Sequence, residues 1–300
     1  MADSQAEEYI ISRGYETIVL GTKWDDMEAE LPILFEIIKK RNIQSILVDS
    51  YQVTEVYLKR LTECVKTAYI DDLNRFTYQV DMLICYANYW NKFGYEERYS
   101  GIKLLLGTKY IPLRKVFSDI KERQIKERVE NILLLSGGSD TYHVLDCILE
   151  EIKEKDLKKI NVICGRYYER YGELAEKYKA YKHISIYWAV ENMEDYMQEA
   201  DLAVSAGGTT LYELCACGTP VISYAFADNQ LDNVRQFEKD GIITYAGDVR
   251  NSKMQVVENI SQCIDRMQKF KIRKELSCKM QQLVDGKGAK RIAEQLIQMK

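Results

Sequence analysis

The stretch Ala203-Val-Ser-Ala-Gly-Gly-Thr-Thr-Leu-Tyr-Glu-Leu-Cys-Ala-Cys-Gly-Thr-Pro-Val-Ile-Ser-Tyr224 decides the fold of this chain of 300 residues. An apolar run ends in two glycines, a helical pattern opens at Thr209 and Thr210, and a second apolar run follows Pro220. This order predicts a strand, a tight turn, a helix and another strand. The unpaired N–H groups and the positive dipole end at such a helix N-terminus suit a phosphate group.

Glu213 lies one turn into this predicted helix and allows two interpretations. Its carboxylate can accept two hydrogen bonds from a ribose diol. It can equally form a capping box with Thr210, a common arrangement that needs no ligand.

Two further loops follow predicted strands in the same half of the chain. In Ser136-Gly-Gly-Ser-Asp140, Gly137 and Gly138 allow close approach of a ligand, and Ser139 can donate to a phosphate or simply cap the next helix. Asp228-Asn-Gln230 begins another helix. Three such loops on alternate strands favour a nucleotide-diphosphate site. The predicted nucleotide-binding residues are Gly137, Gly138, Ser139, Ser205, Ala206, Gly207, Gly208, Thr209, Thr210 and Glu213.

Composition narrows the class of protein. The formal net charge of -4 argues against a nucleic-acid binder that relies on a positive field. No apolar run reaches membrane-spanning length, and the first residues lack the pattern of a signal peptide, so we expect a cytoplasmic protein. The eight cysteines stand without a Cys-x-x-Cys pair, and there are only two histidines, which favours buried free thiols over disulfides or a metal site.

Apolar runs alternate with helical patterns in two successive series, which predicts an α/β protein with two parallel-sheet, Rossmann-like domains. The default ligand site is then the cleft between them. The first series of predicted strands is 17–20, 45–49, 66–70, 82–85 and 104–106, and the second is 131–135, 160–164, 184–186, 201–204, 220–224 and 242–245. The charged stretch from Leu113 to Arg128 reads as a solvated helix or a linker between the domains.

The predicted domains are residues 1–118, on the sugar side, and residues 119–285, which bind the nucleotide. A C-terminal helix, 286–300, is expected to pack back on the first domain. In the first domain Tyr51 closes a strand, where a tyrosine packed at the domain edge is the simpler interpretation. Asp71-Asp72 closes the next strand, and a loop anchor or helix cap explains this pair better than a metal site does.

Several enzyme signatures are absent. The sequence contains no Walker loop, no Gly-x-Gly-x-x-Gly and no Gly-x-Ser-x-Gly. It therefore supports neither a P-loop NTPase, nor a typical dinucleotide oxidoreductase, nor an α/β-hydrolase.

The order of motifs resembles a known family. Gly137–Asp140, Ser205–Glu213, Gly218-Thr-Pro220 and Asp228–Gln230 are similar to the C-terminal nucleotide-sugar domain of the MurG-like glycosyltransferases. The chain more closely resembles the UDP-2,4-diacetamido-2,4,6-trideoxy-β-L-altropyranose hydrolases of pseudaminic acid biosynthesis and their spore-coat polysaccharide relatives. The further matches are Val48-Asp-Ser-Tyr51, Tyr69-Ile-Asp-Asp-Leu73, Leu105-Leu-Gly-Thr-Lys-Tyr110 with Leu113-Arg114, and Val284-Asp-Gly-Lys-Gly-Ala-Lys-Arg-Ile292.

This resemblance implies a two-domain glycosyltransferase-B fold in which the C-terminal half holds UDP. It implies attack of water at the anomeric carbon of a UDP-sugar, release of UDP, and no metal or other cofactor. Tyr51, Asn229 and Gln230 are implied to contact the substrate on its sugar side. Glycine backbone and helix dipoles would stabilise the charge that develops on the leaving diphosphate.

The sequence departs from the family at one place. Members begin with a strand, a Gly-His loop that bears the histidine assigned as catalytic, a helix and a second strand, whereas this chain starts near the end of that second strand. His143 and His183 do not match the motif, so no catalytic residue is identified. Because loss of a central strand exposes sheet edges, we expect the natural gene product to be longer, or the chain to need a partner strand.

Three functions follow as hypotheses. The first is a UDP-sugar hydrolase that acts without metal, the second a UDP-sugar glycosyltransferase of the same fold, and the third a catalytically silent nucleotide-sugar-binding subunit.

Overall fold

The computed structural model describes residues 4–299, which form two compact units. Unit 1 comprises the chain as far as Tyr86, then Trp90–Tyr110, and the chain from Lys290 onward. Unit 2 comprises Ala87–Tyr89 and Ile111–Ala289. The chain thus passes into unit 2 at residue 111, where the sequence prediction places the boundary after residue 118.

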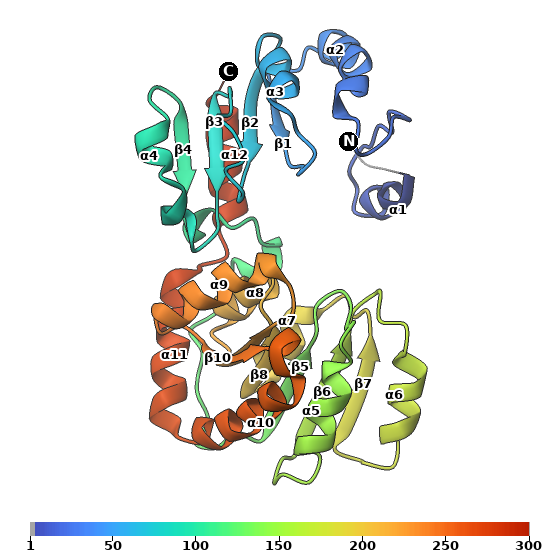
Figure 1. The fold of residues 1–300 in the computed structure, drawn as a ribbon, viewed down its shortest axis with the longest axis vertical. Coiled ribbons are helices and arrows are strands. Elements are labelled where there is room, and N and C mark those ends of the chain that lie inside the picture. Colours follow the sequence, from blue (N-terminus) through green and yellow to red (C-terminus); the bar gives the residue numbers. More distant parts are fainter. Residues whose placement is uncertain (1–3, 300) are drawn as a thin grey trace. The chain divides into compact units, whose positions relative to one another are not determined.

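Unit 1 is built on a four-stranded parallel sheet in the order β1-β2-β3-β4 (Figure 1). Its strands are β1 (Ser45–Val48), β2 (Lys66–Ile70), β3 (Met82–Cys85) and β4 (Lys103–Leu106). Its helices are α1 (Ser4–Ser12), η1 (Met27–Glu30), α2 (Leu31–Lys40), α3 (Glu55–Thr62), η2 (Trp90–Phe93), α4 (Tyr95–Arg98), η3 (Thr108–Tyr110) and α12 (Gly288–Ile297). Strand β1 is therefore an edge of the sheet.

The last helix packs on this sheet. Ile292 of α12 lies in one apolar cluster with Met82 and Ile84 of β3 and with Leu105 of β4. The hydrophobic contact ties the end of the chain to strands that precede it by more than half the sequence. On α2, Leu31, Leu34 and Ile38 are buried, as the helical spacing of its apolar residues indicates.

One expected strand does not form. Residues Thr17–Leu20 have no regular structure, and Val19 is exposed. A run of β-branched residues suits a strand only where a neighbouring strand supplies its backbone hydrogen bonds, and β1 pairs with β2 alone. The prediction of a strand at 17–20 is wrong for this reason.

Unit 2 is built on a six-stranded parallel sheet in the order β10-β9-β8-β5-β6-β7. Its strands are β5 (Asn131–Leu135), β6 (Lys159–Cys164), β7 (Ile184–Trp188), β8 (Leu202–Ala206), β9 (Val221–Ala225) and β10 (Thr244–Asp248). Its helices are η4 (Lys115–Phe117), α5 (Val144–Ile152), α6 (Tyr171–Tyr178), α7 (Met193–Glu199), α8 (Thr210–Cys217), α9 (Asp228–Lys239), α10 (Val249–Met267) and α11 (Phe270–Leu283).

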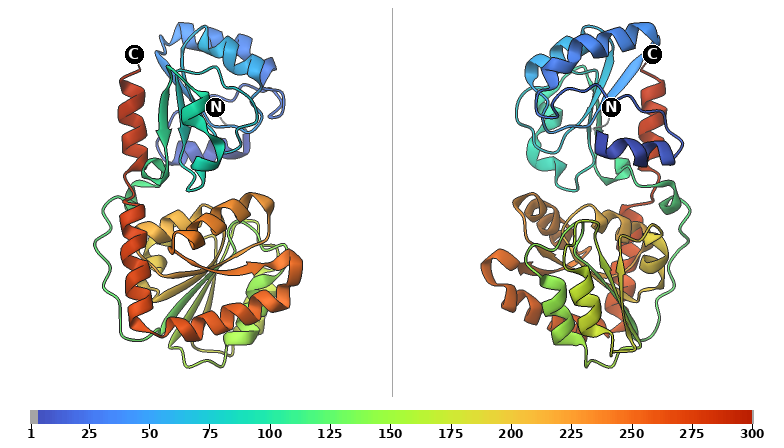
Figure 2. Two further views of the ribbon diagram at one scale, coloured as in Figure 1. Left: turned by 60° about the vertical axis from the view of Figure 1, so that its left-hand side comes forward. Right: turned by 90° about the vertical axis from the view of Figure 1, so that its right-hand side faces the viewer.

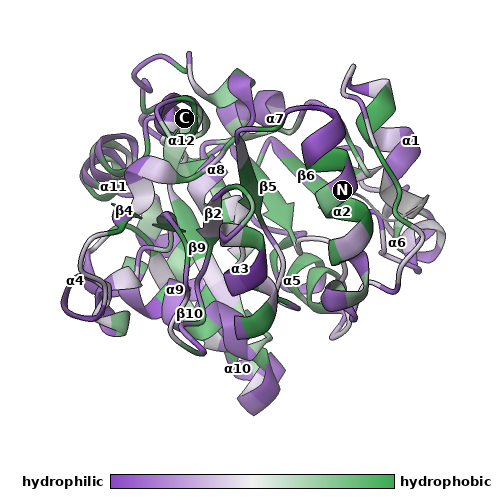
Figure 3. Ribbon diagram, turned by 90° about the horizontal axis from the view of Figure 1, so that it is seen from above, coloured by the Kyte–Doolittle hydropathy of each residue, from purple (hydrophilic) through white to green (hydrophobic). Residues whose placement is uncertain are grey.

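Helices cover both faces of this sheet. Alternate residues of the strands, such as Ile132 and Leu134 of β5, form one large core with α5, α6 and α10. On the other side α8 contacts α7 and α11, and Tyr212 of α8 packs against Phe237 of α9 with 5.1 Å between ring centroids. Strands buried on both faces read as continuous apolar runs, and Figure 3 colours β5, β6 and β9 as hydrophobic segments.

The charged stretch from Leu113 to Arg128 is neither a long helix nor a linker between the units, because all of it belongs to unit 2. After the short turn η4 the chain runs without regular structure to β5, and Figure 2 shows it as an extended segment along unit 2. In the part of the chain that the structure describes, no helix is both long and apolar enough to cross a bilayer. All eight cysteines are free, and Cys64 and Cys278 are exposed, so the expectation of buried thiols fails for these two.

Candidate functional site

The three loops singled out from the sequence lie at one edge of the unit 2 sheet. They follow β5, β8 and β9, which are neighbours in the order β9-β8-β5. All three strands are parallel, so their carboxyl ends meet at the same edge. This edge is where open α/β sheets bind ligands.

A pocket of about 270 Å³ lies between the first two of these loops. Gly137 and Gly138 line one side, and Thr210, the first residue of α8, lines another. The other lining residues come from the ends of β5, β6 and β7 and from the start of α7 and are Leu135, Ile163, Cys164, Gly165, Arg166, Ala189, Val190 and Met193. The pocket thus has a glycine backbone on one side and a helix N-terminus on the other.

Gly165 allows the loops after β5 and β6 to lie in contact. A Cβ atom at Gly165 would be 2.1 Å from the carbonyl oxygen of Gly137 and 2.4 Å from that of Gly138. The N–H group of Tyr167 donates to the Gly138 carbonyl at 3.0 Å. The shape of the Gly137–Gly138 turn therefore depends on a third glycine that comes from another strand.

A buried polar network holds the Gly207–Gly208 turn. The Asn233 amide Nδ2 donates to the carbonyl of Gly207 at 2.9 Å, and Asn233 Oδ1 accepts from the Tyr212 hydroxyl at 2.8 Å. The backbone N–H of Asn88, from the short segment that belongs to unit 2, donates to the Tyr212 hydroxyl at 3.0 Å. Asn233 is only 5% exposed, so these bonds are shielded from water.

The backbone of Gly207 also packs directly on α9. A Cβ atom at this position would lie 2.3 Å from Cγ1 of Val234 and 3.3 Å from Cβ of Gln230. The turn after β8 and the helix after β9 are therefore in contact, and their separation leaves no room for a side chain larger than glycine.

Helices α5 and α8, which both begin at this edge, are capped differently. In α5 the carboxylate of Asp140 accepts from the N–H groups of Val144 at 2.8 Å and Leu145 at 2.9 Å. Burial raises the pKa of Asp140, and these two backbone bonds oppose that rise. Ser139, which the sequence allowed as a cap, therefore does not have this role.

Helix α8 begins without a side-chain cap. Its N-cap is Thr209, whose side chain makes no capping hydrogen bond to any residue the structure describes. The ion pair of Glu213 is with Arg114, which does not support the capping-box interpretation. The N–H groups of Leu211 and Tyr212 donate to the carbonyls of Gly208 and Thr209, whereas no side chain of the N-cap accepts from the start of α8, where Thr210 lines the pocket.

Glu213 lies among charged groups. Its Oε1 atom is 3.9 Å from Nε of Arg114, and Nη2 of Arg114 is 3.1 Å from Oε2 of Glu194. Burial raises the pKa of the Glu213 carboxyl, Arg114 lowers it, and the like charge of Glu194 raises it again. Its side chain is partly buried, with 23% exposure.

The remaining residues predicted for the nucleotide and the sugar lie in different settings. Ser205 and Ala206 belong to β8 and are buried, and the Ser205 hydroxyl donates to the Ala206 carbonyl at 3.1 Å. These two residues are the buried end of the strand that leads into the Gly207–Gly208 turn. Asn229 is exposed on the first turn of α9, while Oε1 of Gln230 accepts from the N–H of Phe226 at 3.0 Å.

Tyr51 belongs to unit 1 and lies just after β1. Its hydroxyl donates to Oδ2 of Asp72 at 3.1 Å, its carbonyl accepts from Arg75, and the ring is 55% exposed. Burial, above all, raises the pKa of Asp72. The contact of Tyr51 with a sugar stays a prediction.

Asp71 anchors its loop, as predicted. The buried carboxylate accepts from the hydroxyls of Tyr78 at 2.7 Å and of Tyr95, and from the N–H groups of Leu73 and Asn74. The ring nitrogen Nε2 of His183 is 3.0 Å from the Lys153 carbonyl oxygen. Among residues 4–299, no group of three His, Cys, Asp or Glu side chains is placed to hold a metal ion.

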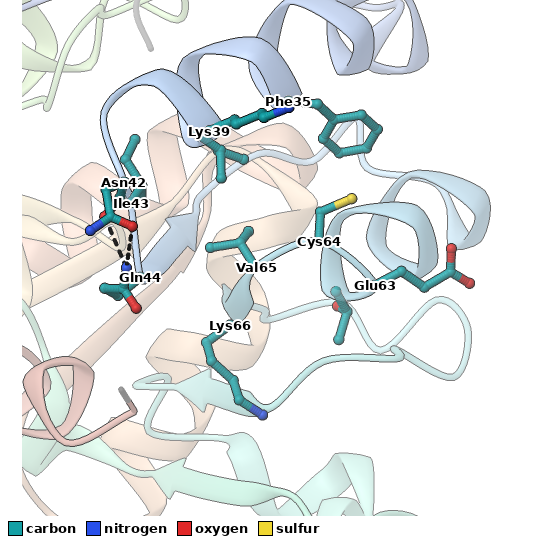
Figure 4. Close-up of a pocket in the computed structure, with 11 residues that line it drawn as sticks. Phe35, Lys39, Asn42, Ile43, Gln44, Glu63, Cys64, Val65 and Lys66 are labelled. Atoms are coloured by element: carbon teal, nitrogen blue, oxygen red, sulfur yellow. Dashed lines mark hydrogen bonds between the residues drawn. The ribbon is translucent and has the colours of Figure 1, made fainter.

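Unit 1 contains a larger hollow of about 730 Å³ (Figure 4). It is lined by Phe35, Lys39, Ile43, Cys64 and Lys66, among others, from the ends of α2 and α3. These residues lie at the amino ends of β1 and β2. The hollow is therefore on the edge of its sheet opposite to the one where parallel sheets bind ligands.

Sequence reasoning missed several residues that line the unit 2 pocket. Gly165 and Arg166 follow β6, and Ala189 and Val190 follow β7. Ala189 has a φ of 45°, a left-handed conformation that is unusual for alanine. A glycine directly after an apolar run was the available signal for the first pair, whereas nothing in the sequence marks Ala189.

The two parallel sheets have the glycosyltransferase-B fold. The solved structure of MurG from Acinetobacter baumannii superposes with a TM-score of 0.66 over 97% of this chain and 87% of that one, at 12% sequence identity. Residues 132–296 match the family model "Glycosyltransferase family 28 C-terminal domain", and the chain belongs to that family.

Two curated relatives have similar sequences. The spore coat polysaccharide biosynthesis protein SpsG of Bacillus subtilis (strain 168) is 27% identical over 194 residues, which cover 62% of this chain and 56% of the relative. The UDP-N-acetylglucosamine–N-acetylmuramyl-(pentapeptide) pyrophosphoryl-undecaprenol N-acetylglucosamine transferase of Helicobacter acinonychis (strain Sheeba) is 29% identical over 197 residues, or 62% of this chain and 55% of that protein. The chain spans about half the length of these relatives.

Proposed function

We propose that unit 2 binds UDP and that the chain is a UDP-sugar hydrolase, with water attacking the anomeric carbon and UDP leaving. The observation that carries the proposal is the meeting of the Gly137–Gly138 turn and the uncapped start of α8 around one pocket. A pyrophosphate bound there accepts hydrogen bonds from backbone N–H groups and lies at the positive end of a helix dipole.

The roles of individual residues follow from this arrangement. Gly137, Gly138, Gly208 and Thr210 supply backbone donors to the diphosphate, and Arg166 adds a cation at the pocket wall. Glu213 accepts hydrogen bonds from the ribose hydroxyls. These interactions strengthen as negative charge builds on the leaving diphosphate, so they accelerate cleavage of the sugar–phosphate bond.

The finer part of the proposal concerns the sugar. By its resemblance to the hydrolases of pseudaminic acid biosynthesis, we infer a UDP-linked diacetamido-trideoxy sugar and a reaction that needs no metal. The similarity to SpsG is compatible with a role in surface polysaccharide synthesis. Asn229 and Tyr51 are the proposed contacts to the sugar side.

The experiment has two stages. Isothermal titration with UDP tests the site, and binding is expected for the unmodified chain but not after Gly165→Ala, which deforms the Gly137–Gly138 turn.

The second stage measures release of UDP and free sugar from the UDP-sugar without an acceptor. Turnover without acceptor supports the hydrolase. Turnover only with an acceptor favours a MurG-like transferase, and UDP binding without any turnover favours a silent binding subunit. Absence of UDP binding refutes the proposal.

A further inference from the structure

Arg114 joins three parts of unit 2 next to the proposed ribose contact. Its Nη1 group donates to the Glu191 carbonyl at 3.0 Å, Nη2 pairs with Oε2 of Glu194 at 3.1 Å, and Nε lies 3.9 Å from Oε1 of Glu213. Glu194 is on α7 and Glu213 is on α8. A guanidinium with its fork of donors can hold two carboxylates and a carbonyl at fixed positions, which a lysine ammonium does less well.

The backbone that carries Arg114 is itself fixed. Arg114 is the N-cap residue of η4, and its guanidinium lies 5.2 Å from the ring centroid of Phe117. Phe117 is 1% exposed, and a Cβ at Gly286 would lie 2.1 Å from its carbonyl oxygen. The guanidinium is therefore held by a buried ring beneath it as well as by its polar partners.

The electrostatic surroundings of Glu213 contain a cation, Arg114, and a second carboxylate, Glu194. The titratable groups that face Glu213 are Arg114 before η4, Glu194 on α7 and the Cys217 thiol on its own helix. Strand β8 packs on α8 with the uncharged sequence Leu202-Ala-Val-Ser-Ala206, and α11 meets the other end of α8 through uncharged Ser277 and Gln281. One guanidinium thus lies between two partly buried carboxylates, and its removal would leave both without this cation.

We propose that Arg114 is a positioning residue for nucleotide recognition, which holds a positive charge beside the Glu213 carboxylate so that both of its oxygens accept hydrogen bonds from a ribose diol. This inference rests on the proposed function and deepens it. An ionised acceptor forms stronger hydrogen bonds than a protonated one, and a ribose offers two donors where a 2′-deoxyribose offers one. The chain should therefore favour UDP over 2′-deoxy-UDP.

The test is a titration of UDP into the full chain at a series of pH values. In the unmodified chain the affinity falls as pH decreases through the pKa of Glu213. Arg114→Gln should move this midpoint to higher pH, so that the affinity loss is large in acid, roughly tenfold for each pH unit by which the midpoint moves, and small well above it. Glu194→Gln removes the opposing charge and should move the midpoint to lower pH.

Controls separate positioning from folding. Arg128→Gln removes an exposed arginine from the same charged stretch and should leave UDP affinity unchanged at every pH. Arg114→Lys should restore part of the affinity, and Arg114→Gln should lower the preference for UDP over 2′-deoxy-UDP. A ¹³C NMR titration of the Glu213 carboxyl without nucleotide should show the same two opposite displacements of its pKa.

The outcomes distinguish failure of the proposed function from failure of the role proposed for Arg114. If the unmodified chain binds no UDP, the proposed function fails, and the assignment of a nucleotide role to Arg114 fails with it. If it binds UDP but Arg114→Gln weakens binding by the same factor at every pH, or if the two charge variants move the midpoint in the same direction, the proposed function stands and the role of Arg114 is refuted.

Discussion

The substitution Asn233→Ala tests whether the buried amide holds the Gly207–Gly208 turn. It removes the donor to the Gly207 carbonyl at 2.9 Å and the acceptor of the Tyr212 hydroxyl at 2.8 Å. A buried polar group left without a partner costs about 1–3 kcal/mol, so losing both bonds should lower the free energy of unfolding by about 2–5 kcal/mol. Water entering the space left by the amide would bring the loss toward the lower value.

The assay is equilibrium urea unfolding followed by circular dichroism, together with UDP titration of the folded variant. The control is Asn229→Ala, on the exposed side of the same helix, which should change stability by less than about 0.5 kcal/mol. Asn233→Asp keeps an acceptor for Tyr212 but turns a carboxylate toward the Gly207 carbonyl. Protonation turns that repulsion into a hydrogen bond, so this variant should become relatively more stable as pH falls.

Two results would contradict the role assigned to Asn233. A stability of Asn233→Ala within about 0.5 kcal/mol of the unmodified chain would mean that the network contributes little. A clear loss of stability with unchanged UDP affinity would mean that the network matters to folding but that the turn is not part of a nucleotide site.

Three further predictions address other parts of the site. Gly165→Ala should lower the free energy of unfolding by about 3 kcal/mol or more and abolish UDP binding, because the new Cβ atom would be 2.1 Å from the Gly137 carbonyl oxygen. The control is Gly172→Ala, where no atom lies within 4 Å of the new Cβ, and it should stabilise α6 by about 0.5–1 kcal/mol in the same urea assay. Asp140→Ala should cost about 1–2 kcal/mol through loss of the α5 cap, with Thr141→Ala as an exposed control, and an unchanged urea midpoint would contradict this role. Glu213→Gln should weaken UDP binding at pH 7 without loss of stability. Because burial raises the folded-state pKa of Glu213, the unmodified chain loses stability as pH rises from the unfolded-state pKa through the folded one, and this fall should be absent from the urea midpoints of the variant.

Apolar runs in the sequence correctly predict the positions of the buried strands of unit 2. The runs at 131–135 and 160–164 lie in β5 and β6, since a central parallel strand is apolar on both faces and has a pattern that a local window detects. The run at 17–20 has the same residue types but no regular structure. Whether a neighbouring strand exists is not encoded in the run itself.

The candidate site was predictable to the extent that its signals are local. The turns at Gly137 and Gly208 are marked by paired glycines between an apolar run and a helical pattern. The contact of Gly165 with the first turn and the ion pair of Arg114 with Glu213 join residues that are distant in the sequence. Such contacts depend on the strand order, which places β5 beside β8 and β6, and periodicity does not reveal that order.

The most direct test of the central claim is the change in backbone amide NMR signals when UDP is added to the full chain. The largest shifts are expected at Gly137, Gly138 and Thr210, which line the pocket in unit 2, and at Gly208, which precedes helix α8. No comparable shift is expected at Asn42 or Lys66, which line the hollow in unit 1. Saturable shifts confined to other surfaces, or none at millimolar UDP, would contradict the account.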